Sequence, residues 1–192
     1  MRLFLLAYLV LACGPATTWG AEDLSVEAIR KGEFIEVRAQ ATVDASMSII
    51  WTTLTDYERL PEFIPGLKKS RVVSRRGKTV IVEQSGEARF LVFSFPIDVT
   101  LESKEHPPEG IQVRALSGTL RFFEGGYQIV PQHGGSKVLL RWTGSIIPDA
   151  SFPPLIGEVV MRMRIEDQFI GMVQEIERRE TLRRKEKDAA QK

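Results

Sequence analysis

A long amphipathic segment near the C-terminus constrains the fold of this chain most. Residues 154–187 contain no proline after Pro154, and their only glycines are Gly157 and Gly171. Apolar side chains recur there with the three- and four-residue spacing of one helix face: Ile165, Phe169, Met172 and Ile176, with Ile156, Val159, Val160, Met163, Ile170 and Val173 in the neighbouring rows. Such a helix would run about 50 Å, whereas a ten-residue strand runs about 33 Å, so its last turns should project beyond a sheet packed on it.

The N-terminus has the pattern of a secretory signal peptide. Arg2 precedes the apolar run at residues 3–12, and the small residues Thr18 and Gly20 lie three and one positions before Ala21. The apolar run is too short to span a bilayer, which takes about 20 residues. We therefore expect residues 1–20 to be removed and the protein to be exported, to a periplasm or out of the cell.

A second cleavage scheme competes with the first. Residues 10–13 read VLAC, which is similar to a lipoprotein box whose cysteine, Cys13, would be acylated and become the new N-terminus. Cys13 is the only cysteine of the chain, so the folded part can contain no disulfide and no thiol nucleophile.

Charge is distributed unevenly along the chain. Without residues 1–20 there are 25 basic and 25 acidic residues, and seven basic but only three acidic ones fall in residues 178–192. A nucleic-acid-binding protein would carry its basic residues on a folded face, so nucleic acid is not an expected partner. The basic end at residues 181–192 is instead either a solvated helix end or a transient contact with anionic lipid headgroups.

Between these ends the chain reads mainly as strands. Residues 35–43 alternate apolar and polar side chains, as a half-buried strand does. Two short helices are expected next, at residues 46–54 and 56–63, with Asp44 or Ser46 capping the first and Asp56 capping the second. Further strands are predicted at residues 71–75, 79–87, 93–102, 111–115, 120–130 and 138–147. Pro96 within the third of these argues for an edge or a bulge.

The order of elements predicts an α+β fold in a single domain. Hairpin connections without helical crossovers require an antiparallel sheet, here of seven strands, and one polar face per strand leaves the other face to be covered. Only the C-terminal helix is long enough to cover it. We expect a curved sheet around that helix at residues 33–180, preceded by a lead-in at residues 21–32.

Several stretches resemble the START-like polyketide cyclase/dehydrase proteins, a group that includes the coenzyme Q-binding proteins. The resemblance is carried by VDA at 43–45, Trp51, LTDYERLPEFIPG at 54–66, KKS at 68–70 and FSFPIDV at 93–99. It implies a helix-grip fold with a largely apolar tunnel between sheet and helix. It also implies binding of a lipid, quinone, isoprenoid, fatty acid or polyketide, and some members of the family are enzymes.

The sequence offers little for catalysis or metal binding. His106 and His133, the only histidines, lie in turns beside proline or glycine. Glu83, Glu87, Asp98 and Asp56 are candidate acids or bases, but Asp98 shares the polar phase of its strand with Glu102, and Asp56 is interpreted as a helix cap. We predict no catalytic residue, no metal and no cofactor.

The preferred hypothesis is an exported carrier or sequestering protein for a hydrophobic small molecule or lipid. Its tunnel wall is predicted from large apolar side chains, namely Trp51, Phe63, Phe93, Phe95, Phe122, Trp142, Met163 and Phe169. Tyr127, Gln84 and Arg141 are candidate polar contributors. The alternatives are a cyclase or dehydratase acting on a similar ligand, and a protein-interaction module whose cavity has collapsed.

Overall fold

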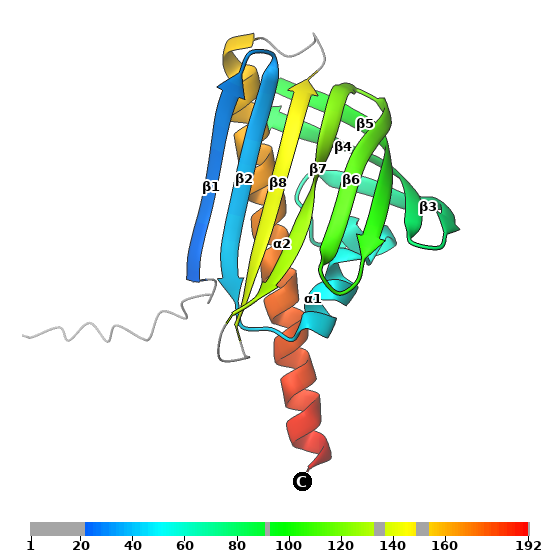
Figure 1. The fold of residues 1–192 in the computed structure, drawn as a ribbon, viewed down its shortest axis with the longest axis vertical. Coiled ribbons are helices and arrows are strands. Elements are labelled where there is room, and N and C mark those ends of the chain that lie inside the picture. Colours follow the sequence, from blue (N-terminus) through cyan, green and yellow to red (C-terminus); the bar gives the residue numbers. More distant parts are fainter. Residues whose placement is uncertain (1–21, 91–92, 133–136, 149–153, 192) are drawn as a thin grey trace, which may run out of the picture.

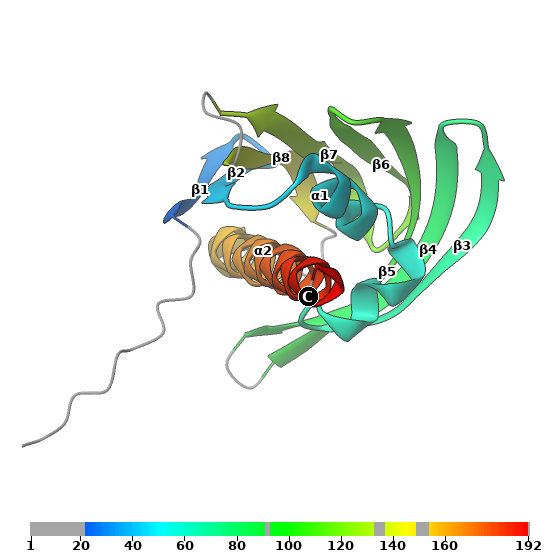
Figure 2. The ribbon, with the colours of Figure 1, turned by 90° about the horizontal axis from the view of Figure 1, so that it is seen from below.

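The chain folds as one eight-stranded antiparallel sheet curved around a long C-terminal helix (Figures 1 and 2). The computed structural model describes residues 22–90, 93–132, 137–148 and 154–191. The elements are β1 (Glu22–Lys31), β2 (Phe34–Val43), α1 (Met47–Leu54), the 3-10 helix η1 (Tyr57–Glu62), β3 (Leu67–Arg76), β4 (Thr79–Phe90), β5 (Phe93–His106), β6 (Gly110–Gly118), β7 (Leu120–Pro131), β8 (Val138–Pro148) and α2 (Pro154–Ala190). The strand order is β1-β2-β8-β7-β6-β5-β4-β3. This confirms the predicted α+β fold.

The strand count is eight, where seven were predicted, because the expected lead-in forms β1. This strand pairs along β2 at the edge of the sheet. Val26 and Ala28 pack against the core, but Leu24 and Ile29 are exposed. An edge strand with apolar side chains on both faces has weak alternation, which is why the sequence pattern did not reveal it.

The predicted alternation of β2 is confirmed. Its odd-numbered side chains, Ile35, Val37, Ala39, Ala41 and Val43, are at most 2% exposed and turn toward α2. Their partners on β8 include Leu140, Trp142 and Ile146, which are also buried. We call this side of the sheet the inner face and the opposite side the outer face.

The helix α2 buries one face and exposes another. Ile165, Phe169, Met172 and Ile176 belong to the core, as predicted. Val159 and Met163, expected in neighbouring apolar rows, are 46% and 42% exposed, because they lie on the opposite side of the helix. The last turns of α2 extend beyond the sheet (Figure 1). No helix in the described ranges is long and apolar enough to cross a membrane.

The unusual position of Pro96 in a strand has a simple explanation. Residues 93–98 of β5 pair with β4, whereas pairing with β6 begins only at Val99. Pro96 therefore lies where one side of β5 carries no partner strand, and its missing N–H breaks no ladder there.

The segment that contains α1 and η1 is held against α2 by ion pairs. Neither Ser46 nor Asp56 makes a side-chain capping hydrogen bond, so the predicted capping roles were wrong. Asp56 instead accepts from Arg179 at 2.8 Å, and Asp44 accepts from Arg184 at 2.8 Å. These two contacts tie both ends of α1 to the helix.

Candidate functional site

One end of the inner face is closed by η1. Tyr57 is buried there, and its hydroxyl lies 2.8 Å from Ser103 Oγ and donates to Glu105 Oε1 at 3.2 Å. Arg75 donates to both carboxylate oxygens of Glu105, at 2.9 and 3.0 Å. Burial is the main cause that raises the pKa of Tyr57 to about 12. The cluster is satisfied internally and seals this end.

The sequence pattern did not predict this cluster, although a signal was present. Ser103 and Glu105 continue the inward phase of β5 that Val99 and Leu101 begin. A carboxylate in the buried phase of a strand requires a partner, and Tyr57 and Arg75 supply it.

The other end of the inner face is only partly covered. Inward-facing residues near the turn between β6 and β7 are half-buried, in contrast to the sealed inner side of β2: Phe95, Ile97, Val113, Ala115, Leu120 and Phe123. At the closed end the corresponding side chains, such as Ile111 and Ile129, are 5% exposed. We call the half-buried set the open end. It offers apolar surface that neither helix nor strand fully covers.

Two aromatic pairs line the inner face between the two ends. The Phe123 and Trp142 rings stack with centroids 6.4 Å apart, and the Tyr127 and Phe169 rings stack at 6.3 Å. The Trp142 indole lies across Gly144, where any Cβ would collide with it. Burial raises the pKa of Tyr127, so its hydroxyl stays protonated. Trp142 and Phe169 thus meet Phe123 and Tyr127 in one aromatic wall.

One cation also lies on the inner face. Arg164 of α2 is 9% exposed, and its guanidinium occupies the space over Gly66, where a Cβ would come within 2.6 Å of Nη1. Gly66 has a φ of +74°, a conformation that glycine adopts without strain. The Pro-Gly pair at the end of the LPEFIPG motif therefore makes room for a buried arginine.

The residues predicted to form the tunnel wall differ in how deeply they are buried. Trp142 and Phe169 are buried on the inner face, and Trp51, Phe63 and Phe95 are half-buried against the core. The backbone of Phe93 begins β5, but its side chain lies outside the described part of the structure. Contact of these residues with a ligand stays a prediction.

Two of the predicted wall residues need correction. Phe122 packs edge-on against Phe34 at 5.5 Å on the outer face, because the register shift between Leu120 and Phe122 changes the phase of β7. Met163 lies on the exposed side of α2. Strand and helix periodicity predict which residues share a face, but a bulge or a broad apolar helix hides which face it is.

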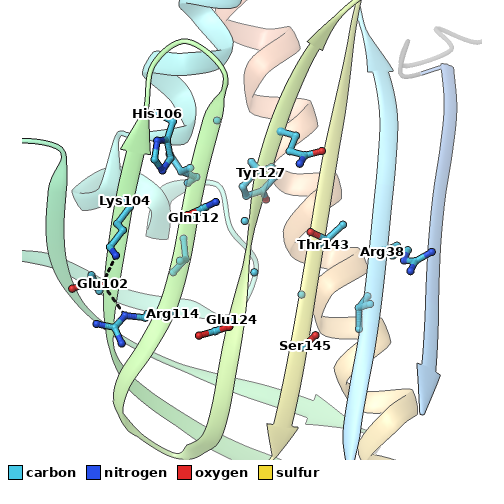
Figure 3. Close-up of a pocket in the computed structure, with 18 of the residues that line it drawn as sticks. Arg38, Glu102, Lys104, His106, Gln112, Arg114, Glu124, Tyr127, Thr143 and Ser145 are labelled. Carbon is cyan, nitrogen blue, oxygen red and sulfur yellow. Dashed lines mark hydrogen bonds and ion pairs between the residues drawn. The ribbon is translucent and has the colours of Figure 1, made fainter. Parts of the chain in front are cut away.

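The outer face carries a separate groove of about 820 Å³ (Figure 3). It runs across β5, β6, β7, β8 and β2, and polar or charged side chains line it, including Arg38, Gln112, Arg114, Glu124 and Thr143. Glu102 accepts from Arg114 at 2.7 Å. Because charged side chains of both signs line it, this groove offers little apolar burial and does not match the predicted tunnel.

The candidate acids and bases outside the closed end are engaged on the surface. Glu83 pairs with Arg71 at 2.6 Å, and Glu87 pairs with Lys68 at 2.7 Å. Asp98 and His106 are exposed, whereas His133 lies outside the described residues. Two residues were also expected as polar members of the tunnel wall. Gln84 donates a hydrogen bond to Ser70 at 3.2 Å, and Arg141 is exposed. The described residues form no cluster of three or more potential metal ligands.

Comparisons with known proteins agree with this architecture. A family model described as polyketide cyclase / dehydrase and lipid transport matches residues 43–181. A STAR-related lipid transfer protein from Xanthomonas axonopodis has a TM-score of 0.68 at 13% identity, covering 83% of this chain and 96% of that one. The Zhui aromatase/cyclase from a Streptomyces species has a TM-score of 0.66 at 14% identity, covering 78% and 95%.

A START superfamily protein from Mycobacterium smegmatis is similar as well, with a TM-score of 0.57 at 17% identity over 77% of this chain and 97% of that one. At such identities these likenesses show the fold alone. A search of curated protein sequences finds no match.

Proposed function

The chain belongs to the polyketide cyclase/dehydrase and lipid transport family, and on this premise we propose that it binds a hydrophobic small molecule or lipid on its inner face. The ligand would lie at the open end, against the wall formed by Phe123, Trp142, Tyr127 and Phe169. The protein would act as a carrier or a sequestering protein.

The observation that carries this proposal is the contrast within one sheet face. Inward side chains of β2 are sealed, whereas those of β6 and β7 at the open end are half-buried. Apolar burial contributes about 25 cal/mol per Å², so a ligand that covers about 200 Å² there gains about 5 kcal/mol. Size and shape of the apolar part would then decide affinity more than polar detail.

Two tryptophan substitutions on opposite faces of β6 test the location. Ala115→Trp should fill the open end and abolish uptake of lipid by the purified protein, as measured by native mass spectrometry after incubation with a lipid extract. Gln112→Trp changes the outer face and should leave uptake intact. The reverse pattern would assign the ligand to the outer groove. Absence of any bound lipid in the wild-type protein would instead favour the interaction module.

The cyclase or dehydratase alternative rests on the closed end. Tyr57 and Glu105 are a buried acid and a buried carboxylate on the inner face, and an enzyme of this kind needs a positioned acid or base. The two groups are already engaged with Ser103 and Arg75, which favours a structural role. A bound compound whose mass changes with wild-type protein but not with Tyr57→Phe would favour the enzyme.

Export and membrane contact are further proposals, supported by sequence. The run at residues 3–12 supports export, and palmitate labelling of wild type and Cys13→Ser in the native host would separate a lipoprotein from a soluble product.

Contact with anionic lipid headgroups would rest on Lys185 and Lys187, because Arg179 and Arg184 are held in ion pairs. Sedimentation with anionic vesicles, compared with a Lys185→Gln/Lys187→Gln variant, tests it.

A further inference from the structure

Arg164 differs from the other buried charged groups of this protein. Glu105, Glu175 and Glu180 each accept hydrogen bonds from at least one arginine. Arg164 is equally buried, and its Nε has no hydrogen-bond partner among the residues that the structure describes. The Nε of this buried cation is thus left without a hydrogen bond, whereas the acidic counterparts each have one from an arginine.

An unpaired buried charge is unfavourable for the folded protein. Removing an ionised group from water costs several kcal/mol unless a charge of opposite sign and hydrogen bonds replace the water. Burial accordingly lowers the pKa of the Arg164 guanidinium, and the nearby carboxylates of Asp167 and Glu87 offset only part of this effect. Arginine nonetheless stays protonated in proteins, so the site keeps its positive charge.

The position of Arg164 connects it to the open end. Its guanidinium lies over Gly66 and beside the backbone of Glu87 on β4. In the sheet register Gly86 pairs with Ile97, one of the half-buried residues of the open end. The cation therefore lies at the level of the sheet where apolar inner surface remains uncovered.

We propose that Arg164 binds the carboxylate of an amphipathic ligand whose apolar part covers the open end. This inference rests on the proposed function and specifies its ligand class, a monocarboxylic acid with a hydrocarbon or ring body. Guanidinium groups bind carboxylates through two parallel N–H donors, and the unpartnered Nε supplies one of them.

The charge around Arg164 favours a ligand with one negative charge. Asp167 and Glu87 lie close enough to act on its pKa, and their negative field would oppose a doubly charged phosphate monoester more than a carboxylate. An alcohol of the same chain length would leave the cation unpaired. A carboxylate is the headgroup that satisfies both conditions.

Calorimetric titration with three ligands of equal chain length tests the inference. Decanoate, decan-1-ol and decyl phosphate are titrated into wild type, Arg164→Met and Arg162→Met at pH 7. We expect wild type to prefer decanoate over decanol by at least about tenfold, since a charge-assisted pair replaces an unmet donor. Arg164→Met should lose that preference and bind decanol as wild type does. Arg162, an exposed arginine paired with Glu166, is the matched control and should change nothing.

Each outcome decides a separate point. Equal binding of decanoate and decanol by wild type would overturn the carboxylate site and leave the proposed function standing. This comparison uses the wild-type protein alone. Tighter binding of decyl phosphate would overturn the assignment of a single negative charge. Failure of wild type to bind any of the three would contradict the proposed function itself.

Arg164→Met should also unfold at no lower urea concentration than wild type, because methionine removes an unpaired buried charge. A large fall in the urea midpoint would show that Arg164 is paired within the fold.

Discussion

The guanidinium of Arg179 joins α2 to the segment between α1 and η1, because its Nη2 lies 2.8 Å from Asp56 Oδ2 while its Nε lies 2.6 Å from Glu175 Oε1 on its own helix. The pattern recurs five residues later, where Arg184 bonds Asp44 and Glu180. In both places a buried glutamate of α2 orients an arginine toward an aspartate that flanks α1.

These two contacts differ in exposure, and a difference in strength follows. The side chains of Arg179 and Asp56 are 15% and 27% exposed, whereas those of Arg184 and Asp44 are both 49% exposed. We expect double-mutant cycles with alanine to give a coupling of about 1 kcal/mol for the first pair and less than about 0.5 kcal/mol for the second. Urea unfolding measures both. Equal couplings would mean that burial does not strengthen the first pair.

Acid should weaken the fold through Glu180. Hydrogen bonds from Arg183, then Arg184 and Ser46, lower the pKa of Glu180 to about 2 against the opposing effect of burial. A carboxylate with a lowered pKa stabilises the folded state above its unfolded pKa, and this contribution disappears as the pH falls from about 4.5 to about 2. The urea midpoint of wild type should fall more steeply over this range than that of Glu180→Gln. Parallel curves would show that Glu180 does not carry the effect.

Truncations on the two sides of α2 should separate core from surface. Phe169 is 1% exposed and stacks on Tyr127, so Phe169→Ala should cost about 3 to 5 kcal/mol. Met163→Ala should change stability by no more than about 0.5 kcal/mol, because its side chain lies on the exposed side. Chemical denaturation of both variants measures the free energy of unfolding. A loss of about 3 kcal/mol or more in Met163→Ala would show that Met163 belongs to the core.

Gly66 offers a test of where Arg164 lies. A Cβ at Gly66 would meet the Arg164 guanidinium, whereas Gly77, which also has a positive φ of 57°, has open space around it. Gly66→Ala should therefore lose about 1 kcal/mol or more beyond the loss in Gly77→Ala, which reports the backbone strain alone. The extra loss should shrink in an Arg164→Met background. An unchanged difference would assign the conflict to the backbone of Glu87 instead.

Much of the fold could be predicted from local patterns. The alternation of β2 and the three- and four-residue spacing around Ile165 and Phe169 each identify an element and its buried face. β1 was missed because an edge strand with Leu24 and Ile29 exposed alternates poorly. Capping by Asp56 was predicted from its position before a helix, but a distant arginine competes for the same carboxylate.

The site was harder to predict than the fold. Trp142 and Phe169 were found because large apolar residues in a buried phase are conspicuous. Phe122 was misplaced because a register shift in β7 cannot be read from composition. Arg164 and Glu105 were overlooked for a different reason. A charged residue among the buried positions of a helix or strand looks like a break in the apolar pattern, and only contacts with distant residues show what surrounds its charge.

The two ends of the inner face also differ in how they would respond to ionic strength. The end beneath α1 and η1 is held by ion pairs of Asp44 and Asp56, whereas the half-buried residues that define the opposite end are apolar. Salt screens exposed ion pairs and leaves apolar contacts intact or stronger. The release rate of a bound uncharged ligand such as decan-1-ol would thus rise with sodium chloride concentration if the exit lay past α1, and would hold steady or fall if it lay at the open end, so release rates measured over a series of salt concentrations identify the exit.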